Sequence, residues 1–313
     1  MTKKSKYKKW DDLNFKGIIF IELITLPILY IFNYFKNIAS SKKSLKIKKL
    51  RSPVLQERIY VNIHEWGGYE SKRFKNSINK LIVGFECGLH YQLTRYKNQN
   101  INREIELSVT ISDAEKYRNL ELLKNEVNKI IFVSNDGMDF SGYSTLYSMI
   151  KDLPNAYVIL TNSSVNALQD DFLEEYINYM EKNPDVGIFG TSYCTKIYQS
   201  LIKNNFHTHL QSFFLLTTTE VLKEIVEANK NIFPGKGIKN KLLLIRKGEI
   251  KISEIAKNLG YNLAVVIESG KVYKFGKNSL FDNGHNNWIL QKGDMRIHVK
   301  NPNKMNPIKS EYK

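Results

Sequence analysis

Residues 129–161 read KIIFVSNDGMDFSGYSTLYSMIKDLPNAYVILT, and this stretch decides the fold class. A run rich in Ile, Phe and Val is followed by a helical pattern over residues 143–151 and then by a second apolar run at 157–161. Strand, helix and strand in this order predict parallel strands that are joined by a crossover helix. The alternation continues on both sides of the stretch, which predicts an α/β fold with a mostly parallel central sheet.

The rest of the chain supplies further elements of the same two kinds. Other predicted strands lie at residues 58–63, 104–110, 186–190, 212–216 and 262–268, and helical patterns lie at 72–96, 114–126, 170–182, 193–202, 219–229 and 252–259. We expect one domain over residues 51–300 and a polar, loose tail at 301–313. Cys87 and Cys194 are the two cysteines of the 313 residues, which excludes a disulfide scaffold and indicates a reducing compartment.

Most of the positive charge lies at the start of the chain. Residues 1–51 hold thirteen basic and three acidic side chains, hence ten of the sixteen net positive charges. Between the basic clusters, residues 17–35 read GIIFIELITLPILYIFNYF, with Glu22 and Thr25 on one narrow polar stripe of a helix. We expect residues 1–50 to associate with the membrane, with residues 17–35 as an apolar helix in the interface and the flanking lysines on anionic headgroups. A membrane span, which Glu22 makes costly, a signal peptide and a core helix are the alternatives.

Polar residues follow two predicted strands at the edge where ligands of open α/β sheets bind. Their amides, carboxylates and hydroxyls suit hydrogen bonds to sugar hydroxyls, and glycine lets a ligand approach the backbone. Taken singly, each loop is more typical of a turn, in the first loop together with a helix N-cap, than of a binding site. Common nucleotide, zinc-protease and serine-hydrolase motifs are absent from the sequence. The loop residues are Asn135, Asp136, Gly137 and Asp139 after the first strand, and Asn162, Ser163 and Ser164 after the second.

With three further motifs, the two loops resemble the rhamnan synthesis F family of bacterial polysaccharide glycosyltransferases. The resemblance covers residues 58–268 and keeps the order of the family's motifs. It implies the GT-A fold, a nucleotide-binding α/β sandwich related to glycosyltransferase family 2. The motifs are His64-Glu65-Trp66-Gly67-Gly68-Tyr69, Asn-x-Gly-x-Asp-Phe-x-Gly-Tyr at 135–143, Leu-x-Asn-x-Ser-Val at 160–165, His-x-Gln-Ser-Phe-Phe-Leu at 209–215 and Glu-Ile-x-Ile-Ser at 249–253.

The resemblance also implies an activity. Such an enzyme moves a sugar, with rhamnose as the first expectation, from a nucleotide-diphosphate donor to a lipid-linked surface polysaccharide on the cytoplasmic face of the cell membrane. Glu249 matches the general base of an inverting transfer, with helix capping as its alternative role and Glu254 as the fallback base. The expected donor-binding residues are His64 and the residues of the two loops. The expected acceptor-binding residues are His209, Gln211 and Ser212, although both histidines also suit a buried core.

One departure from the wider family concerns the metal. Family 2 enzymes carry a D-x-D that holds Mg²⁺ or Mn²⁺ on the donor diphosphate, whereas this chain reads Asn162-Ser163-Ser164. Either Asp136 and Asp139 supply carboxylates to a cation, or basic groups such as Arg246 and Lys247 neutralise the diphosphate. The departure keeps a second function open, namely a catalytically silent glycan-binding or scaffold protein.

Nucleic-acid binding is disfavoured as a third function. It requires basic residues interleaved with aromatic ones across the folded domain. Here the charge gathers beside the apolar segment of residues 17–35 instead. We therefore expect no nucleic acid among the partners of this protein.

Overall fold

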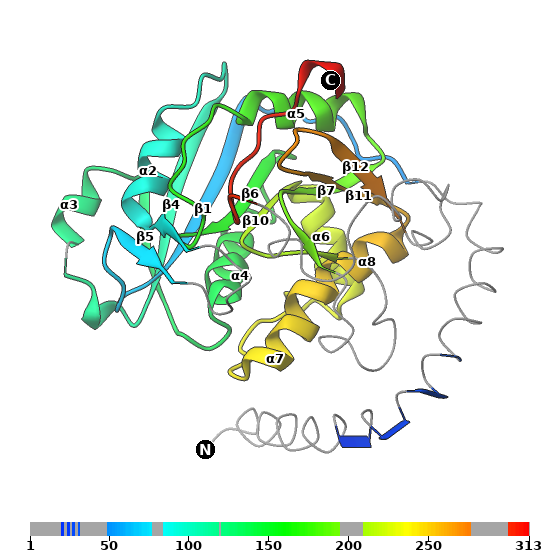
Figure 1. Ribbon diagram of the computed structural model, residues 1–313, viewed down its shortest axis with the longest axis horizontal. Helices are drawn as coiled ribbons and strands as arrows, with labels where there is room; N and C mark the ends of the chain where they lie inside the picture. The colour runs from blue at the N-terminus through cyan, green and yellow to red at the C-terminus, as the bar shows by residue number, and fades with distance from the viewer. Residues whose placement is uncertain are drawn as a thin grey trace.

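A mixed sheet forms the middle layer of the domain. The computed structural model describes residues 49–76, 84–118, 120–194, 209–276 and 300–312, together with scattered positions between residues 20 and 31. The eight-stranded sheet has the order β12-β11-β7-β10-β6-β1-β4-β5 (Figure 1). Its strands are β1 (Arg58–Trp66), β4 (Glu104–Ser112), β5 (Lys129–Val133), β6 (Tyr157–Asn162), β7 (Val186–Gly190), β10 (Phe214–Thr218), β11 (Asn262–Val266) and β12 (Val272–Phe275).

The directions of the strands bear out a mostly parallel sheet. β1 pairs in parallel with β4 and β6, β4 with β5, and β7 with β11. β10 runs antiparallel to both β6 and β7, and β12 runs antiparallel to β11. Because β10 is reversed, its first residue Phe214 pairs with Thr161 near the end of β6. The residues before β10 therefore lie at the edge where β1 and β6 end.

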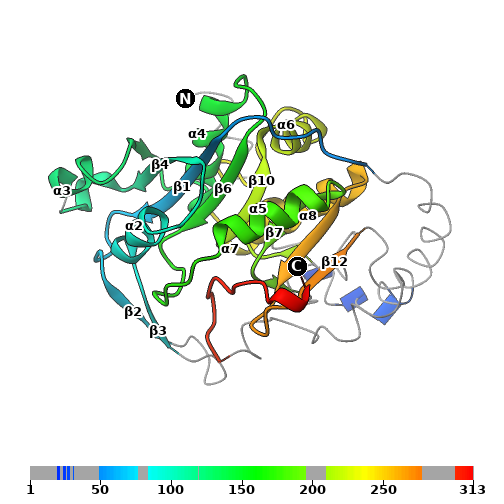
Figure 2. The ribbon, with the colours of Figure 1, turned by 90° about the horizontal axis from the view of Figure 1, so that it is seen from above.

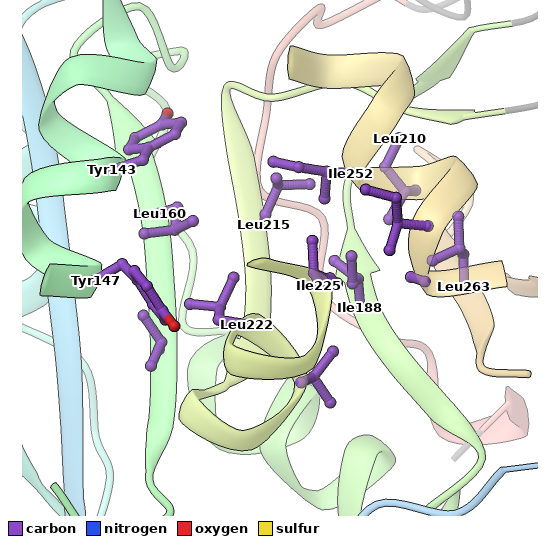
Figure 3. Packing of buried hydrophobic residues seen from close by; sticks show 14 of the residues in the cluster. Tyr143, Tyr147, Leu160, Ile188, Leu210, Leu215, Leu222, Ile225, Ile252 and Leu263 are labelled. Carbon is purple, nitrogen blue, oxygen red and sulfur yellow. The ribbon is translucent and has the colours of Figure 1, made fainter. Parts of the chain in front are cut away.

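Helices cover both faces of the sheet, as the α/β prediction requires. Helices α4, α6 and α8 pack on one face, and α2 and α5 pack on the other (Figure 2). Figure 3 shows the first of these two cores, with Tyr143 and Tyr147 of α4, Leu160 of β6 and Ile252 of α8. The helices are α2 (Leu89–Lys97), α3 (Leu120–Lys124), α4 (Asp139–Ile150), α5 (Leu173–Lys182), α6 (Thr219–Ala228), α7 (Lys241–Leu244) and α8 (Lys251–Leu259).

Three predicted helices are wrong in part. Residues 72–96 hold a hairpin of β2 (Arg73–Lys75) and β3 (Phe85–Cys87) before α2 begins, since Gly88 has a φ of 135° that no helix accepts. Residues 114–126 form a 3-10 turn and the short α3. Residues 193–202 begin with β8 (Tyr193–Cys194), which pairs with β9 (His209–Leu210), and the rest of that range lies outside the described residues.

The helix predicted at 252–259 starts much earlier. It begins at Lys241, where the Asn240 side chain accepts hydrogen bonds from the backbone N–H groups of Leu242 and Leu243. A π-helical turn, Ile245–Ile250, then joins α7 to α8. Glu249 lies inside this turn, so the helix-capping role for Glu249 is wrong and Asn240 is the cap.

The expectation of a loose C-terminal tail is also wrong. Met305 and Ile308 are 0% and 2% exposed in the core beside α5. The Tyr176 hydroxyl donates a hydrogen bond of 2.6 Å to the Asn306 carbonyl, and the Glu268 carboxylate accepts one from the backbone N–H of Asn301. Apolar side chains at 305 and 308 interrupt the polar pattern, and they are what bind residues 300–312 to the domain.

The predicted membrane segment, residues 1–50, lies mostly outside the described residues. The described apolar side chains between residues 20 and 31 are helical and exposed, and no helix in the described part of the chain is long and apolar enough to cross a membrane. Lys49 belongs with the domain rather than with this segment. Its backbone N–H donates to the Gly260 carbonyl at 3.1 Å, and its ammonium lies 2.6 Å from the Glu224 carboxylate.

Candidate functional site

The two predicted donor loops meet at the edge where β6 ends. Asp139 is the first residue of α4, and its carboxylate accepts a hydrogen bond of 2.6 Å from the Asn162 amide. The Asn162 side-chain oxygen in turn accepts one from the backbone N–H of Ser164. Gly137 has a φ of 110°, and a Cβ there would lie 3.1 Å from the Gly237 nitrogen. The absence of a side chain at Gly137 therefore lets the first loop pack closely against the segment that holds Gly237. Asp139 and Asn162 thus form one polar cluster.

Asp136 and Asn135 lie on the rim of this cluster and point to different partners. The Asp136 carboxylate pairs with the Lys239 ammonium at 3.1 Å. The Asn135 amide lies 3.4 Å from the carboxylate of Asp113, which follows β4. Of the carboxylates that were grouped by sequence, Asp139 alone contacts Asn162 among the described contacts. We therefore place Asp139 at the centre of the donor loops.

Asp113 was missed by the sequence analysis. Its carboxylate accepts a hydrogen bond of 2.8 Å from the Trp66 indole, and the hydrogen bonds from Trp66 and Lys116 lower the pKa of Asp113. Asp113 also has a φ of 50°, a conformation that few residues other than glycine adopt. A polar residue directly after a predicted strand was the signal that could have found it.

Ser163 connects the end of β6 to the end of β1. Its hydroxyl donates to the buried Glu65 carboxylate at 2.8 Å and accepts from the Arg73 guanidinium at 2.7 Å. Arg73 lies 3.4 Å from Glu65 and 4.0 Å from the centre of the Tyr69 ring. Burial raises the pKa of Glu65 to about 7, although the Arg73 cation opposes this rise. The cluster holds the turn at Asn162 and Ser163 against β1, and its charged members were missed because Arg73 lies in the misassigned helix.

His64 is a buried core residue. It is 3% exposed, and its ring nitrogens lie 3.2 Å and 3.4 Å from the hydroxyls of Thr110 and Ser112. Helix α4 passes directly over it, because a Cβ at Gly142 would lie 2.7 Å from the His64 Nδ1. Burial lowers the pKa of His64. Since both ring nitrogens have partners, we leave His64 out of the candidate site.

The predicted base and two acceptor residues form a second cluster at the reversed strand β10. The Glu249 Oε2 accepts hydrogen bonds from the Ser212 backbone N–H at 2.7 Å and from its hydroxyl at 2.8 Å. The His209 ring nitrogen Nε2 lies 3.6 Å from the Glu249 Oε1, and the ring has no hydrogen-bond partner among the described residues. Oε2 is therefore held in place by Ser212, and Oε1 faces the His209 ring.

The surroundings of Glu249 keep it ionised. Burial by itself raises the pKa of the Glu249 carboxyl, but the His209 ring and the hydrogen bonds from Ser212 outweigh it, so this pKa lies below its usual value. The side chain keeps 13% of its surface exposed. A partly accessible carboxylate that is ionised at neutral pH is able to accept a proton.

The other predicted acceptor residue, the fallback base and the two basic candidates do not contact Glu249 among the described contacts. The Gln211 side-chain oxygen accepts a hydrogen bond from the Ser192 hydroxyl, which connects the residues that flank β8 and β9. Glu254, the fallback base, pairs with Lys251 at 3.2 Å on α8. Arg246 and Lys247 lie in the same π-helical turn as Glu249. Of the two predicted bases, Glu249 is thus the one that contacts a predicted acceptor residue, Ser212.

The residues of the site do not fit a divalent cation. Mg²⁺ and Mn²⁺ need several oxygen ligands that converge on one point. Asp139 accepts from an amide, Asp136 pairs with an ammonium and Asp113 accepts from an indole. In the ranges that the structure describes, no group of three or more His, Cys, Asp or Glu side chains gathers as a metal site would. We derive no catalytic step through a metal.

Comparison with known proteins gives distant structural similarity. No protein-family model and no curated protein matches the sequence. A mannosyltransferase from Pyrobaculum calidifontis, solved with GDP-Man and Mn²⁺, is 13% identical, with a TM-score of 0.39 over 80% of this chain and 67% of its own. The 4-diphosphocytidyl-2C-methyl-D-erythritol synthase from Anaerococcus prevotii is 8% identical, with a TM-score of 0.36 over 71% of this chain and 89% of its own.

A third similar structure is HddC from Yersinia pseudotuberculosis. It is 16% identical, with a TM-score of 0.29 over 53% of this chain and 78% of its own. At these values the similarities do not decide which reaction the chain performs. No family model supports the resemblance to the rhamnan synthesis F family, which therefore rests on the sequence motifs. The structure itself shows a mostly parallel α/β sandwich with two polar clusters at one edge of its sheet.

Proposed function

We propose that this protein is a glycosyltransferase that moves a sugar from a nucleotide-diphosphate donor to an acceptor hydroxyl. The observation that carries the proposal is the position of Glu249. Its ionised carboxylate is held by Ser212, which lies just before β10 and beside the end of β6, where Asp139 and Asn162 meet. A donor cluster next to a base is the arrangement that an inverting transfer needs.

The proposed reaction assigns a role to each cluster. The acceptor oxygen attacks the anomeric carbon, the bond from that carbon to the diphosphate oxygen breaks, and the hydroxyl proton passes to the Glu249 Oε1. Asp139 and Asn162 hold the sugar or ribose hydroxyls of the donor. Residues 229–248, which include Lys239 and the first four residues of the π-helical turn, contain six basic and no acidic residues. This segment favours the negative charge that develops on the leaving diphosphate.

Donor binding should depend on Asp139. A donor that binds only the folded protein stabilises it by about 2.7 kcal/mol at a hundred times its dissociation constant. We expect at least one of dTDP-rhamnose, GDP-mannose and UDP-glucose to raise the melting temperature of the wild-type protein, and Asp139→Ala to abolish that rise. Asp152→Ala is the matched control, since Asp152 follows α4 and its side chain is 80% exposed. If none of the three donors moves the melting temperature of the wild type, the donor site is wrong.

The second candidate function is the silent glycan-binding or scaffold protein. The lack of D-x-D carboxylates and the poor fit to a cation favour it. The two functions differ in turnover, measured as release of the nucleoside diphosphate from the donor. A protein that binds a donor and releases no nucleoside diphosphate, even with glycan acceptors present, is the silent one.

We propose further that the donor sugar is rhamnose, that the acceptor is a lipid-linked glycan, and that residues 1–48 hold the enzyme on the cytoplasmic face of the membrane. The rhamnose and the acceptor rest on the resemblance to the rhamnan synthesis F family. The membrane contact rests on the basic clusters and on the exposed apolar side chains, which suit the surface of an anionic bilayer. These side chains are Phe20, Ile21, Ile24, Ile28 and Ile31, each 58–71% exposed.

Deleting residues 1–48 tests the membrane contact. We expect the full chain to sediment with vesicles that contain anionic phospholipid and the shortened chain to stay in the supernatant with an unchanged far-UV circular dichroism spectrum. Lys49 is kept because it contacts Gly260 and Glu224. Neutral phosphatidylcholine vesicles are the control, since they lack the charge that the lysines would contact. A shortened chain that still sediments would place the membrane contact elsewhere.

A further inference from the structure

The Phe140 ring joins the donor cluster to the base. Phe140 follows Asp139 on α4 and is 3% exposed. A Cβ built at Gly248, the residue before Glu249, would lie 2.9 Å from the tip of this ring, and one at Gly235 would lie 2.8 Å from its base. The ring therefore lies against two backbone segments that have no side chain to shield them. One of these segments is the π-helical turn that carries Glu249.

A second contact joins the same two parts of the site. The Tyr143 hydroxyl donates a hydrogen bond of 2.8 Å to the Ser212 carbonyl, and Ser212 donates twice to the Glu249 Oε2. Tyr143 is fully buried and stands three residues after Phe140, so the two side chains lie on the same face of α4. Their rings also meet edge to face, with centroids 5.6 Å apart.

We propose that α4 is a spacer that fixes the position of the Glu249 carboxylate relative to Asp139, with Phe140 and Tyr143 as its positioning residues. This inference rests on the proposed function, because it needs Glu249 to act on a substrate held by Asp139. Closely packed interiors transmit small displacements. A misplacement of about 1 Å at a reacting group is enough to cost about 10²-fold in rate.

The glycine at 248 leaves room for the Phe140 ring against the π-helical turn. Glycine inside a helix costs about 0.5–1 kcal/mol relative to alanine. The backbone of Gly248 does not have a positive φ, so the conformation itself accepts alanine. The use of glycine here is explained by the room that the Phe140 ring takes. The π-helical turn at Gly248 agrees with a role in positioning Glu249, because such turns are frequent at functional sites.

Gly248→Ala tests the spacer, with release of nucleoside diphosphate from dTDP-rhamnose, GDP-mannose or UDP-glucose as the assay and water as the acceptor. We expect kcat to fall about 10²-fold, because the added methyl group displaces either the ring or the turn, and the donor KM to change little. Phe140→Leu removes the atoms that the methyl group meets. In the double variant Gly248→Ala/Phe140→Leu, we expect kcat to recover at least about tenfold relative to Gly248→Ala, by relief of the overlap.

Gly187→Ala is the matched control for packing alone. A Cβ at Gly187 in β7 would lie 2.8 Å from Tyr261, and neither residue contacts the candidate site in the described structure. We expect Gly187→Ala to lower the melting temperature and to leave kcat unchanged. For the second contact, Tyr143→Phe should lower kcat, and Tyr147→Phe, one turn further along α4, should not.

Each outcome of these assays bears on the spacer or on the proposed transferase activity. If Gly248→Ala lowers the melting temperature as Gly187→Ala does and leaves kcat unchanged, the spacer is wrong although the transferase stands. If Gly248→Ala fails to fold, the comparison of Tyr143→Phe with Tyr147→Phe takes its place, and equal kcat values for these two overturn the spacer. A wild-type protein that binds and turns over none of the donors overturns the proposed function, and the spacer with it.

Discussion

Glu249→Gln is expected to lower kcat by about 10²–10⁴-fold and to leave the melting temperature nearly unchanged. The range is what general-base assistance typically contributes. Glutamine keeps the side-chain oxygen that accepts the two hydrogen bonds from Ser212, so the start of β10 stays in place. It cannot take up the acceptor proton at neutral pH, and the deficit should appear in turnover at saturating donor.

Glu254→Gln is the matched control for this experiment. Glu254 lies five residues further along and pairs with Lys251, so its substitution should change neither kcat nor donor affinity by more than a small factor. Turnover and melting temperature are measured on the same preparations. Retained activity together with a lowered melting temperature for Glu249→Gln would make Glu249 a structural anchor of Ser212, and the base would have to be another group.

Met305→Ala is expected to destabilise the fold by about 2–5 kcal/mol, the usual cost of truncating a fully buried Met. Met305 is 0% exposed in the core on the α5 face of the sheet. Unfolding by urea, followed by circular dichroism, gives the change in free energy. Met149→Ala is the control, since Met149 on α4 is 43% exposed and should cost no more than about 0.5 kcal/mol. Equal effects of the two substitutions would mean that residues 300–312 do not stabilise the domain.

The sequence predicted the central sheet well because the strands are short runs of β-branched residues with helical patterns between them. It located β1, β4, β5, β6, β7, β10 and β11 to within a few residues. It did not predict that β10 is reversed, because the direction of a strand depends on its neighbours in space and leaves no periodic signal. Periodicity also failed around Gly88, where one residue with a positive φ separates a hairpin from a helix.

The candidate site, too, was predicted only in part from the sequence. The pairing of Asp139 with Asn162 and the approach of Ser212 to Glu249 agree with groups of residues that the motifs brought together. Glu65 and Arg73 were missed because Arg73 lies in a stretch that was predicted as a helix, and because their shared partner Ser163 lies far away in the sequence. His64 fitted a ligand contact equally well until Thr110 and Ser112 were found against its ring.

The reversal of β10 has a consequence for how such a protein changes its substrates. The proposed donor cluster, Asp139 and Asn162, is built from residues before 165, after β5 and at the end of β6, whereas Glu249, Ser212 and His209 come from the chain after β7. The two halves of the site are thus separate stretches of the gene that meet through one antiparallel strand. On the proposed roles of the two clusters, recombination that exchanges the later stretch between relatives would change the acceptor and retain the donor. Proteins that share this fold could in this way form different linkages from the same donor.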